Sequence, residues 1–177
     1  MHFLEKDLEQ IIWESTTEQL EEKGLHITES YNPKEFKKFR QLRIGNYGIS
    51  DLIYVSRYYE PVAEWDSRRT LEINIVELKK GDVNTDTLKQ ALRYANGVRE
   101  YLKYRNKFRG GGINNYVKHK ITLIGRKVDL TTEFLDLLNF IGIEVVIYTY
   151  DYTIDGITFE VFEWENYSMS NRGFENK

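Results

Sequence analysis

Hydrophobic positions recur at helical spacing in three stretches of the chain, and each stretch predicts a helix: residues 3–23, 84–105 and 131–142. The second pattern is the clearest, and its buried face is predicted to consist of Leu88, Ala91, Ala95, Val98 and Leu102. The second helix can be capped by Asn84, Thr85 or Asp86, and the third by Thr131 or Thr132. Gly24 and Gly142 are expected to end the first and third helices.

Alternating or continuous apolar runs predict strands over residues 25–31, 49–56, 71–80, 118–129 and 143–150. The pair Asp155-Gly156 lies between two alternating runs and predicts a hairpin. The basic stretch Lys34–Arg43 is expected to be a short helix or a loop, and Pro61 to Arg69 a link between strands. Residues 105–115 contain three consecutive glycines and predict a flexible loop, and residues 166–177 predict a flexible tail.

The order of these elements indicates an α/β protein, a mixed β-sheet flanked by helices on both faces. The strand–helix–strand unit between residues 71 and 124 should make its two strands parallel. With 177 residues, the chain suits one domain, expected over residues 1–165.

Composition restricts the chemistry that the chain can perform. It has no cysteine and three scattered histidines, which excludes a thiolate zinc site or a cysteine nucleophile and disfavours a histidine-based metal cluster or Ser-His-Asp triad. Carboxylates must therefore carry any metal chemistry. No apolar run is long enough to span a bilayer, and the N-terminus lacks the pattern of a secretion signal. We expect no membrane partner and a cytoplasmic, intracellular protein.

Charge is segregated along the chain although the net charge is only -3. Residues 1–30 carry 2 basic and 8 acidic side chains, residues 31–109 carry 17 and 10, and residues 110–177 carry 6 and 10. A basic middle between acidic ends permits a local surface that binds polyanions. The alternative is that these basic residues line ordinary solvated surfaces.

Two predicted strands carry carboxylates on faces that are otherwise apolar. Glu77 and Lys79 continue the face of Leu71, Ile73 and Ile75, because alternate residues share one face of a strand. Asp51 likewise shares its face with isoleucine and valine neighbours. Burying an unpaired carboxylate costs several kcal/mol or more, so something must offset it. A hard divalent cation such as Mg²⁺ meets this need because it prefers oxygen ligands.

A simple ion pair or a position at the strand end could instead explain Glu77 and Lys79. Spacing alone is weak evidence, since the pattern Glu-x-Lys occurs four times in this sequence. Only the copy at Glu77 follows an apolar strand, lies 26 residues after an acid on another strand, and precedes an amphipathic helix. The sequence context therefore favours a functional site at Glu77 and Lys79 over a simple ion pair.

The helix that follows adds a stripe beside its buried face, made of Gln90, Tyr94, Gly97 and Tyr101. Gln90 and Tyr94 lie one turn apart and could reach the acids or a bound phosphate. The alternative is an ordinary half-buried helix border.

The segments GISD, VELKK and QALRY together resemble the PD-(D/E)XK nuclease superfamily, and the Gln-x-x-x-Tyr element is similar to that in nucleases attached to recombination helicases. The resemblance implies a restriction-endonuclease-like fold with an αβββαβ core. It implies metal binding by Asp51, Glu77 and the backbone carbonyl of Leu78, with Lys79 as the catalytic lysine. Glu9 is the best match to the acid that the first helix often adds, and Glu5 the second. Ser50 stands where the family motif has proline.

These residues predict a Mg²⁺-dependent nuclease that hydrolyses phosphodiester bonds of DNA with a metal-activated water, with Mn²⁺ able to substitute. Gln90 and Tyr94 are included in its catalytic set on the strength of the resemblance. The alternatives are a catalytically inactive module that binds DNA or a protein, and a dimeric resolvase of branched DNA. An RNA substrate is disfavoured only by the habits of the family. A homodimer or a protein partner could supply specificity.

Basic residues at the end of the second helix are the expected contacts to nucleic acid: Arg93, Lys103, Arg105, Lys107 and Arg109. Arg99 belongs to the same stretch, in which Tyr104 and Phe108 can stack on bases. The segment KEFKKFRQLR, residues 34–43, is a second candidate of similar composition. For both segments the alternative is a solvated surface.

Overall fold

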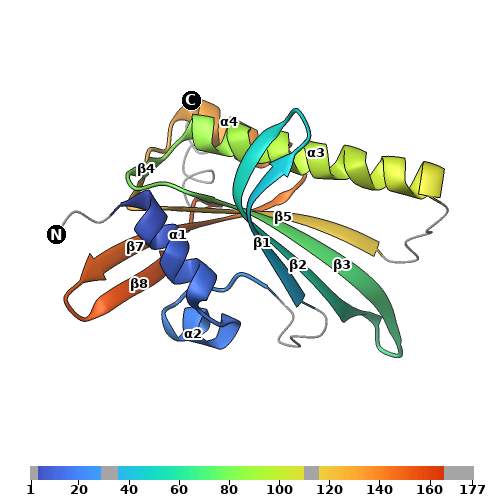
Figure 1. Cartoon of the computed structure of the whole chain (residues 1–177), viewed down its shortest axis with the longest axis horizontal. Helices are drawn as coiled ribbons and strands as arrows, with labels where there is room; N and C mark the ends of the chain where they lie inside the picture. The colour runs from blue at the N-terminus through green and yellow to red at the C-terminus, as the bar shows by residue number, and fades with distance from the viewer. Residues whose placement is uncertain (1–3, 29–35, 110–115, 166–177) are drawn as a thin grey trace, which may run out of the picture.

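The computed structural model describes residues 4–28, 36–109 and 116–165, without the side chains of 106–109. Its helices are α1 (Glu5–Glu14), α2 (Thr17–Glu22), α3 (Thr85–Arg109) and α4 (Thr132–Phe140). Its strands are β1 (Phe36–Ile44), β2 (Gly48–Ala63), β3 (Asp66–Leu78), β4 (Asp82–Val83), β5 (Tyr116–Gly125), β6 (Lys127–Val128), β7 (Glu144–Thr153) and β8 (Gly156–Val161). Figure 1 shows their arrangement.

The strands other than β4 and β6 form one mixed sheet in the order β1-β2-β3-β5-β7-β8. β3, β5 and β7 run parallel to one another, whereas β1–β2, β2–β3 and β7–β8 are antiparallel pairs. The prediction of parallel strands on either side of the long helix is therefore confirmed. The short β4 and β6 form a separate parallel pair.

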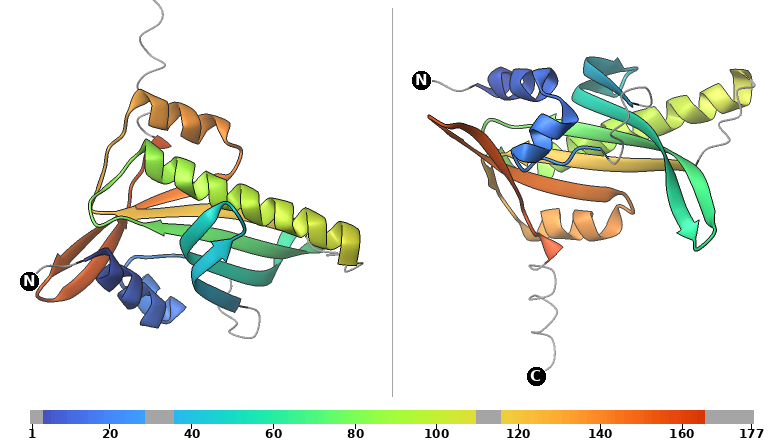
Figure 2. Two further views of the ribbon diagram at one scale, coloured as in Figure 1. Left: turned by 45° about the horizontal axis from the view of Figure 1, so that its top comes forward. Right: turned by 90° about the horizontal axis from the view of Figure 1, so that it is seen from below.

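Helices cover both faces of the sheet, as the sequence predicted. The left view of Figure 2 shows α3 and α4 on one side of the strands and α1 and α2 on the other. On the α3 side, Leu71, Ile73 and Ile75 of β3 pack in a core that includes Leu88, Ala91 and Ala95. On the other side, Val76 and Leu78 pack against Leu8 and Ile12 of α1. Strand alternation thus sends successive residues of β3 into two different cores.

The predicted helix caps and the stripe of the long helix agree with the structure. Asn84 caps α3, because its Oδ1 accepts a hydrogen bond from the Thr87 N–H at 3.1 Å. Thr131 caps α4 by accepting from the Phe134 N–H at 3.1 Å. Within the predicted stripe, Leu88, Ala91 and Ala95 are fully buried, and Val98 and Leu102 are partly buried.

The single helix predicted over residues 3–23 is wrong, because the structure has two helices there. Thr16 starts a second helix: its hydroxyl accepts from the Gln19 N–H at 3.2 Å, and its own N–H donates to Gln19 Oε1 at 2.9 Å. This reciprocal cap competes with continuation of α1. Residues 25–28 are not a strand, although Leu25 and Ile27 are buried beneath the sheet. The rest of that predicted strand lies outside the described residues.

Two further predictions failed in the N-terminal half. The stretch Lys34–Arg43 is neither helix nor loop where it is described, since Phe36–Ile44 is an edge strand. Only part of this strand faces the core, so its apolar residues do not alternate strictly with polar ones. The sequence therefore lacked the alternation that predicts a strand. Pro61 to Arg69 is not a link either. β2 and β3 continue through this stretch as a hairpin that turns at residues 64–65.

Other boundaries moved by a few residues. α3 continues to Arg109, so the first part of the loop expected over residues 105–115 is helical, and the rest is not described. β3 ends at Leu78, which leaves Lys79 just beyond the strand. The hairpin at Asp155-Gly156 is confirmed between β7 and β8. The tail expected over residues 166–177 lies outside the described residues. Within the part of the chain that is described, no helix is long and apolar enough to cross a membrane.

Candidate functional site

Glu77 lies at the carboxyl end of β3 and is completely buried, with an exposed fraction of 0%. Among the described residues, neither of its carboxylate oxygens has a hydrogen-bond partner of ordinary geometry. Burial, reinforced by the charge of Asp51, raises the pKa of Glu77 to about 8. The Lys79 ammonium, the Asp51 N–H and the Ser50 hydroxyl oppose this rise but do not offset it. The sequence predicted a buried carboxylate here, because Glu77 interrupts an otherwise apolar face of the strand.

Asp51 lies on β2 at the point where β2 and β3 stop pairing. The last pair in the register is Leu52 with Val76, and beyond it Asp51 Oδ2 accepts a hydrogen bond from the Leu78 N–H at 3.0 Å. Burial raises the pKa of Asp51, and the charges of Glu5 and Glu9 add to the effect. The Leu78 N–H and the Lys79 ammonium lower it.

Asp51 accepts a hydrogen bond from the backbone of Leu78, the residue between Glu77 and Lys79, so the three charged groups lie at the same end of the β2–β3 pair. The charge of Asp51 raises the pKa of Glu77, and the Lys79 ammonium lowers the pKa of both acids. Lys79 follows β3 and is half-buried, and its own N–H donates to the Ile124 carbonyl at 2.8 Å. The structure therefore brings together the two acids and the lysine that the sequence singled out. Leu78, which lies between Glu77 and Lys79 in the chain, is buried and donates its N–H to Asp51.

Both candidate acids of the first helix point toward this cluster from α1. Glu9 is nearly buried, forms an ion pair with Arg40, and accepts a hydrogen bond from Gln41 at 2.6 Å. Glu5 Oε2 accepts from the Lys80 N–H at 3.0 Å, directly after Lys79. Because both acids raise the pKa of Asp51, Glu5 and Glu9 remain alternatives for the acid that the first helix contributes.

Gln41 of β1 is a site residue that the sequence did not reveal. Its Nε2 donates to Glu9 Oε2 at 2.6 Å and is 3.3 Å from Asp51 Oδ1, so one amide bridges an acid of α1 and an acid of β2. Among the described residues, Gln41 is the one non-glycine with a positive φ, 47°. A strained backbone that aims a side chain at buried acids is typical of a functional site. The segment KEFKKFRQLR was a candidate because of its basic residues, whereas the residue of it that contacts Asp51 is the amide of Gln41.

Two basic residues of that same segment form contacts with α1 and the residue that follows it. Arg40 pairs with Glu9, and Lys38 Nζ donates to the backbone carbonyls of Trp13 and Ser15, the latter at 3.3 Å. Burial lowers the pKa of Lys38. These contacts attach β1 to the first helix, so this part of the segment is an element of the site's scaffold.

Gln90 and Tyr94 contact each other rather than the acids. Gln90 Nε2 donates to the Tyr94 hydroxyl at 2.9 Å, and Tyr94 is 3% exposed. The Tyr94 ring packs on Gly48, where an added Cβ would lie 2.7 Å from its Cε1. Tyr94 thereby supports the start of β2, three residues before Asp51. We interpret the pair as a support of the strand that carries Asp51.

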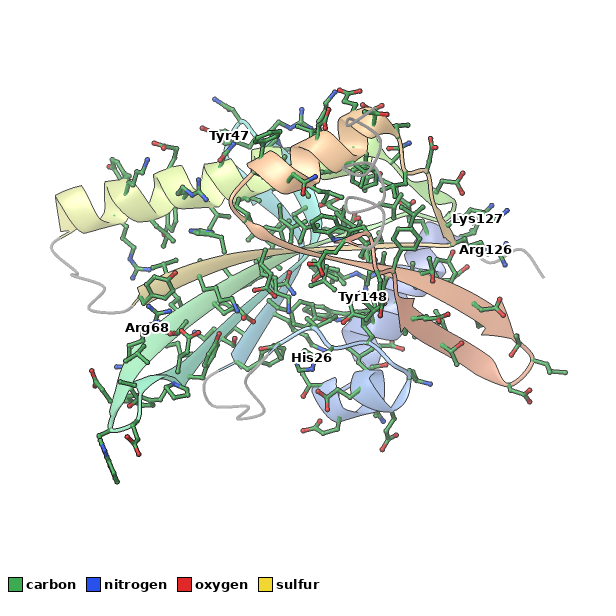
Figure 3. All side chains as sticks on the ribbon, turned by 180° about the vertical axis from the view of Figure 1, so that it is seen from behind. His26, Tyr47, Arg68, Arg126, Lys127 and Tyr148 are labelled. Atoms are coloured by element: carbon green, nitrogen blue, oxygen red, sulfur yellow. The ribbon has the colours of Figure 1, made fainter. Side chains whose placement is uncertain are left out.

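Gly97 continues the same contact one turn later. An added Cβ there would lie 2.6 Å from Ile44 and 2.7 Å from Tyr47, so only glycine lets the β1–β2 turn rest on α3. Figure 3 labels Tyr47 beside this helix. The stripe on α3 is thus largely a packing border, except for Tyr101, which is 55% exposed.

The predicted nucleic-acid contacts lie along α3, away from the acids. Arg93 and Arg105 are exposed, and Lys103 is exposed but pairs with Glu100 at 2.9 Å. Lys107 and Arg109 belong to the last turn of the helix, and their side chains lie outside the described residues. None of the described contacts joins these residues to Asp51 or Glu77.

The fit of the cluster to a metal ion rests on Glu77. No group of three or more histidine, cysteine, aspartate and glutamate side chains within the described ranges is arranged to hold an ion. Asp51 and Glu77 supply carboxylate oxygens, the ligands that hard divalent cations prefer. An unpaired and fully buried carboxylate is the group that a cation would satisfy.

A cavity of about 600 Å³ lies elsewhere, between the β5–β6 turn and the β7–β8 hairpin. It is lined by Arg126, Lys127, Thr149, Tyr150, Asp151, Thr158, Phe159 and Glu160. None of the predicted site residues lines it. The Tyr150 hydroxyl links the cavity to the site, because it donates to the Lys80 carbonyl at 3.0 Å.

No family model matches this chain, and neither a curated protein nor a solved structure gives a significant match. Function is therefore inferred from the residues and their geometry.

Proposed function

We propose that this protein is a divalent-metal-dependent nuclease that hydrolyses phosphodiester bonds of DNA and has a restriction-endonuclease-like fold. The observation that carries the proposal is Glu77, a fully buried carboxylate without a hydrogen-bond partner of ordinary geometry among the described residues. It lies beside a second acid, Asp51, and a lysine, Lys79. A structural ion pair would satisfy its oxygens, whereas these oxygens are left for a cation.

The order of elements supports the same proposal. Along the chain, α1, the antiparallel strands β1 to β3, α3 and the parallel strand β5 follow one another in the αβββαβ order that the resemblance implies. The two acids come from β2 and β3, and the chain departs from the family motif at Ser50.

In this mechanism Asp51 and Glu77 would hold Mg²⁺ or Mn²⁺, with the Leu78 carbonyl as a further ligand. When bound, such an ion would supply an activated water and positive charge near the leaving oxygen. Glu77 must be ionised to bind a cation, and its pKa of about 8 means that binding competes with a proton. Lys79 lies beside the acids, where its ammonium group would stabilise negative charge on the attacked phosphate.

A cleavage assay tests the proposal. Labelled single-stranded DNA, duplex DNA, four-way junctions and RNA are each incubated with Mg²⁺, Mn²⁺ or EDTA. We expect metal-dependent cleavage of DNA, with a loss of at least about 10²–10³-fold in Glu77→Gln and Lys79→Ala. The matched control is Glu72→Gln, an equally buried acid on the same strand, which should keep its activity.

The outcomes separate the alternatives. Preference for junctions over linear duplex would identify a resolvase of branched DNA, and cleavage of RNA alone would reassign the substrate. Folded protein that binds DNA but cuts no polynucleotide with either metal would favour the inactive module and overturn the proposal. A homodimer or protein partner is a further proposal that sedimentation of the same sample would test.

A further inference from the structure

β2 and β3 extend beyond the helices as a two-stranded arm, residues 57–70. The right view of Figure 2 shows the arm as a hairpin that projects from the sheet. Trp65 at its turn is 93% exposed, Tyr59 is 66% exposed, and Val62 is 47% exposed. Large exposed aromatic residues on a projecting hairpin indicate contact with a partner.

Charge is divided between the two faces of the arm. Arg57, Tyr59 and Arg69 share the face that points to the α3 side, with Tyr59 directly opposite Arg69. All three are exposed, and this face carries no acid. The other face holds Glu60, whose carboxylate is bound by Arg68 at 2.9 Å and by Thr70 at 3.1 Å.

Arg68 on this second face already has two partners within the protein. Its guanidinium lies 3.6 Å from the centroid of the Tyr116 ring as well as on Glu60, and Figure 3 labels it at the arm. Glu64 and Asp66 belong to the turn region. The acids of the arm thus lie on the second face or at the turn, and the α3-side face is a cationic and aromatic surface.

This surface continues onto α3. Val98 and Leu102 of α3 pack in the same core as Leu71 and Ile73, the residues of β3 that follow the arm. The neighbouring basic residues of the helix therefore border the α3-side face. Of these, Arg105 is exposed and Arg99 is half-buried.

We propose that the α3-side face of the arm binds an unpaired nucleic-acid strand. Arg57 and Arg69 neutralise its phosphates, and Tyr59 and Trp65 stack on its bases. Arginines that flank an exposed aromatic ring without an intervening acid match a polyanion with planar bases better than they match a protein surface. This inference rests on the proposed function and names the form of nucleic acid that the protein holds.

The arm lies at the opposite end of β3 from the candidate site. β3 runs from Asp66 at the arm to Glu77 at the site, which corresponds to roughly 35 Å at about 3.3 Å per residue. Figure 1 shows the arm and α1 at opposite ends of the molecule. At a rise of about 3.4 Å per nucleotide, a strand that reaches both places needs about ten nucleotides.

The test is fluorescence anisotropy with a labelled 30-nucleotide single strand and the matching duplex. The full-length protein is used with EDTA, so that binding is measured without cleavage. We expect the wild type to prefer the single strand, and Tyr59→Ala and Trp65→Ala each to weaken binding on the order of tenfold. The double variant Arg57→Ala/Arg69→Ala should lower the slope of log K against log salt by about 1.4.

Two controls match these changes. Arg126→Ala/Lys127→Ala removes two exposed charges from the β5–β6 turn, and Phe140→Ala removes an aromatic ring that is 87% exposed on α4. Both should bind like the wild type. Arm variants that bind as tightly as the wild type, or that lose no more than these controls, would overturn the inference even if metal-dependent cleavage is observed. Tight duplex binding without arm dependence would do the same.

The design separates this inference from the proposed function. Arm-dependent binding of single strands without cleavage would leave the arm surface standing and reject the nuclease. Cleavage with unchanged binding in the arm variants would reject the arm surface alone. A wild type that binds no polynucleotide would overturn the inference and leave the arm as a surface for a protein.

Discussion

Two buried glutamates of β3, five residues apart, have opposite surroundings. Glu72 is 1% exposed and accepts a hydrogen bond from the Tyr58 hydroxyl at 3.2 Å, with Lys118 Nζ at 3.9 Å. Glu77 is equally buried, and among the described residues no donor of ordinary geometry meets its carboxylate. The two side chains lie on opposite faces of the strand, Glu77 on the α3 side and Glu72 on the α1 side.

Burial of an acid does not by itself indicate function. A buried carboxylate is tolerated when a cation and a donor accompany it, as Lys118 and Tyr58 accompany Glu72. Lys118 also pairs with Glu144 at 2.9 Å, so Glu72 belongs to a structural network. Glu77 has a second acid as its neighbour, and the Lys79 ammonium does not offset the resulting rise of its pKa. This arrangement costs stability unless a ligand supplies further positive charge.

The largest expected effect is on the pH dependence of stability without metal. The folded-state pKa of Glu77 is about 8, above its unfolded value of 4.5, so the folded protein binds the additional proton. The stabilisation from Glu77 is present below about pH 4.5 and is lost as the pH rises to about 8. Glu77→Gln, which mimics the protonated acid, should be more stable than the wild type at pH 9 by roughly 3–5 kcal/mol.

Denaturant unfolding in EDTA at pH 5 and pH 9 measures this difference. The two proteins should have similar free energies of unfolding at pH 5 and diverge at pH 9. Equal stabilities at both pH values would mean that Glu77 is satisfied in the folded state, which would contradict the contrast with Glu72.

A smaller effect of opposite sign is expected at the other glutamate. Glu72→Gln removes the charge that accompanies Lys118 in a buried network, and should lower the free energy of unfolding at pH 7 by about 1–3 kcal/mol. Chemical denaturation of this variant beside Glu77→Gln gives the comparison directly. If Glu72→Gln proved as stable as the wild type, the network around Glu72 would not have the structural role assigned to it.

The smallest effect should come from Gln41, which positions acids through its amide. Gln41→Gly removes the amide and relieves the positive φ, so we expect unchanged or slightly higher stability. The Mg²⁺ concentration for half-maximal cleavage should nevertheless rise about tenfold. Gln41→Asn, which keeps an amide and tolerates this backbone conformation, should recover part of the loss. Unchanged metal dependence in Gln41→Gly would show that the amide bridge is structural only.

The sequence predicted those elements whose pattern is strong and local. The apolar stripe and Asn84 cap predicted α3, and the interruption of an apolar face by Glu77 predicted a buried acid. Asp51 was predicted in the same way, because it interrupts an apolar face of its own strand. In each case a single element holds the signal, because the residue conflicts with its immediate neighbours on one strand face.

What the sequence did not reveal depends on tertiary contacts. β1 was missed because an edge strand buries little, and its side chains Arg40 and Gln41 are fixed by α1. The arm was missed because Pro61 suggested a break, although proline is tolerated on an exposed β-ribbon. The interpretation of Gln90 and Tyr94 changed because the partner of Tyr94, Gly48, lies far away in the sequence.

The central claim is that Asp51 and Glu77 hold one divalent cation, and isothermal titration of Mn²⁺ into metal-free protein at pH 8 tests it most directly. The wild type and Glu72→Gln should bind Mn²⁺ alike, whereas Asp51→Asn and Glu77→Gln should lose most of the binding. Binding of Mn²⁺ to Glu77→Gln with unchanged affinity, or no binding to folded wild type, would contradict the account.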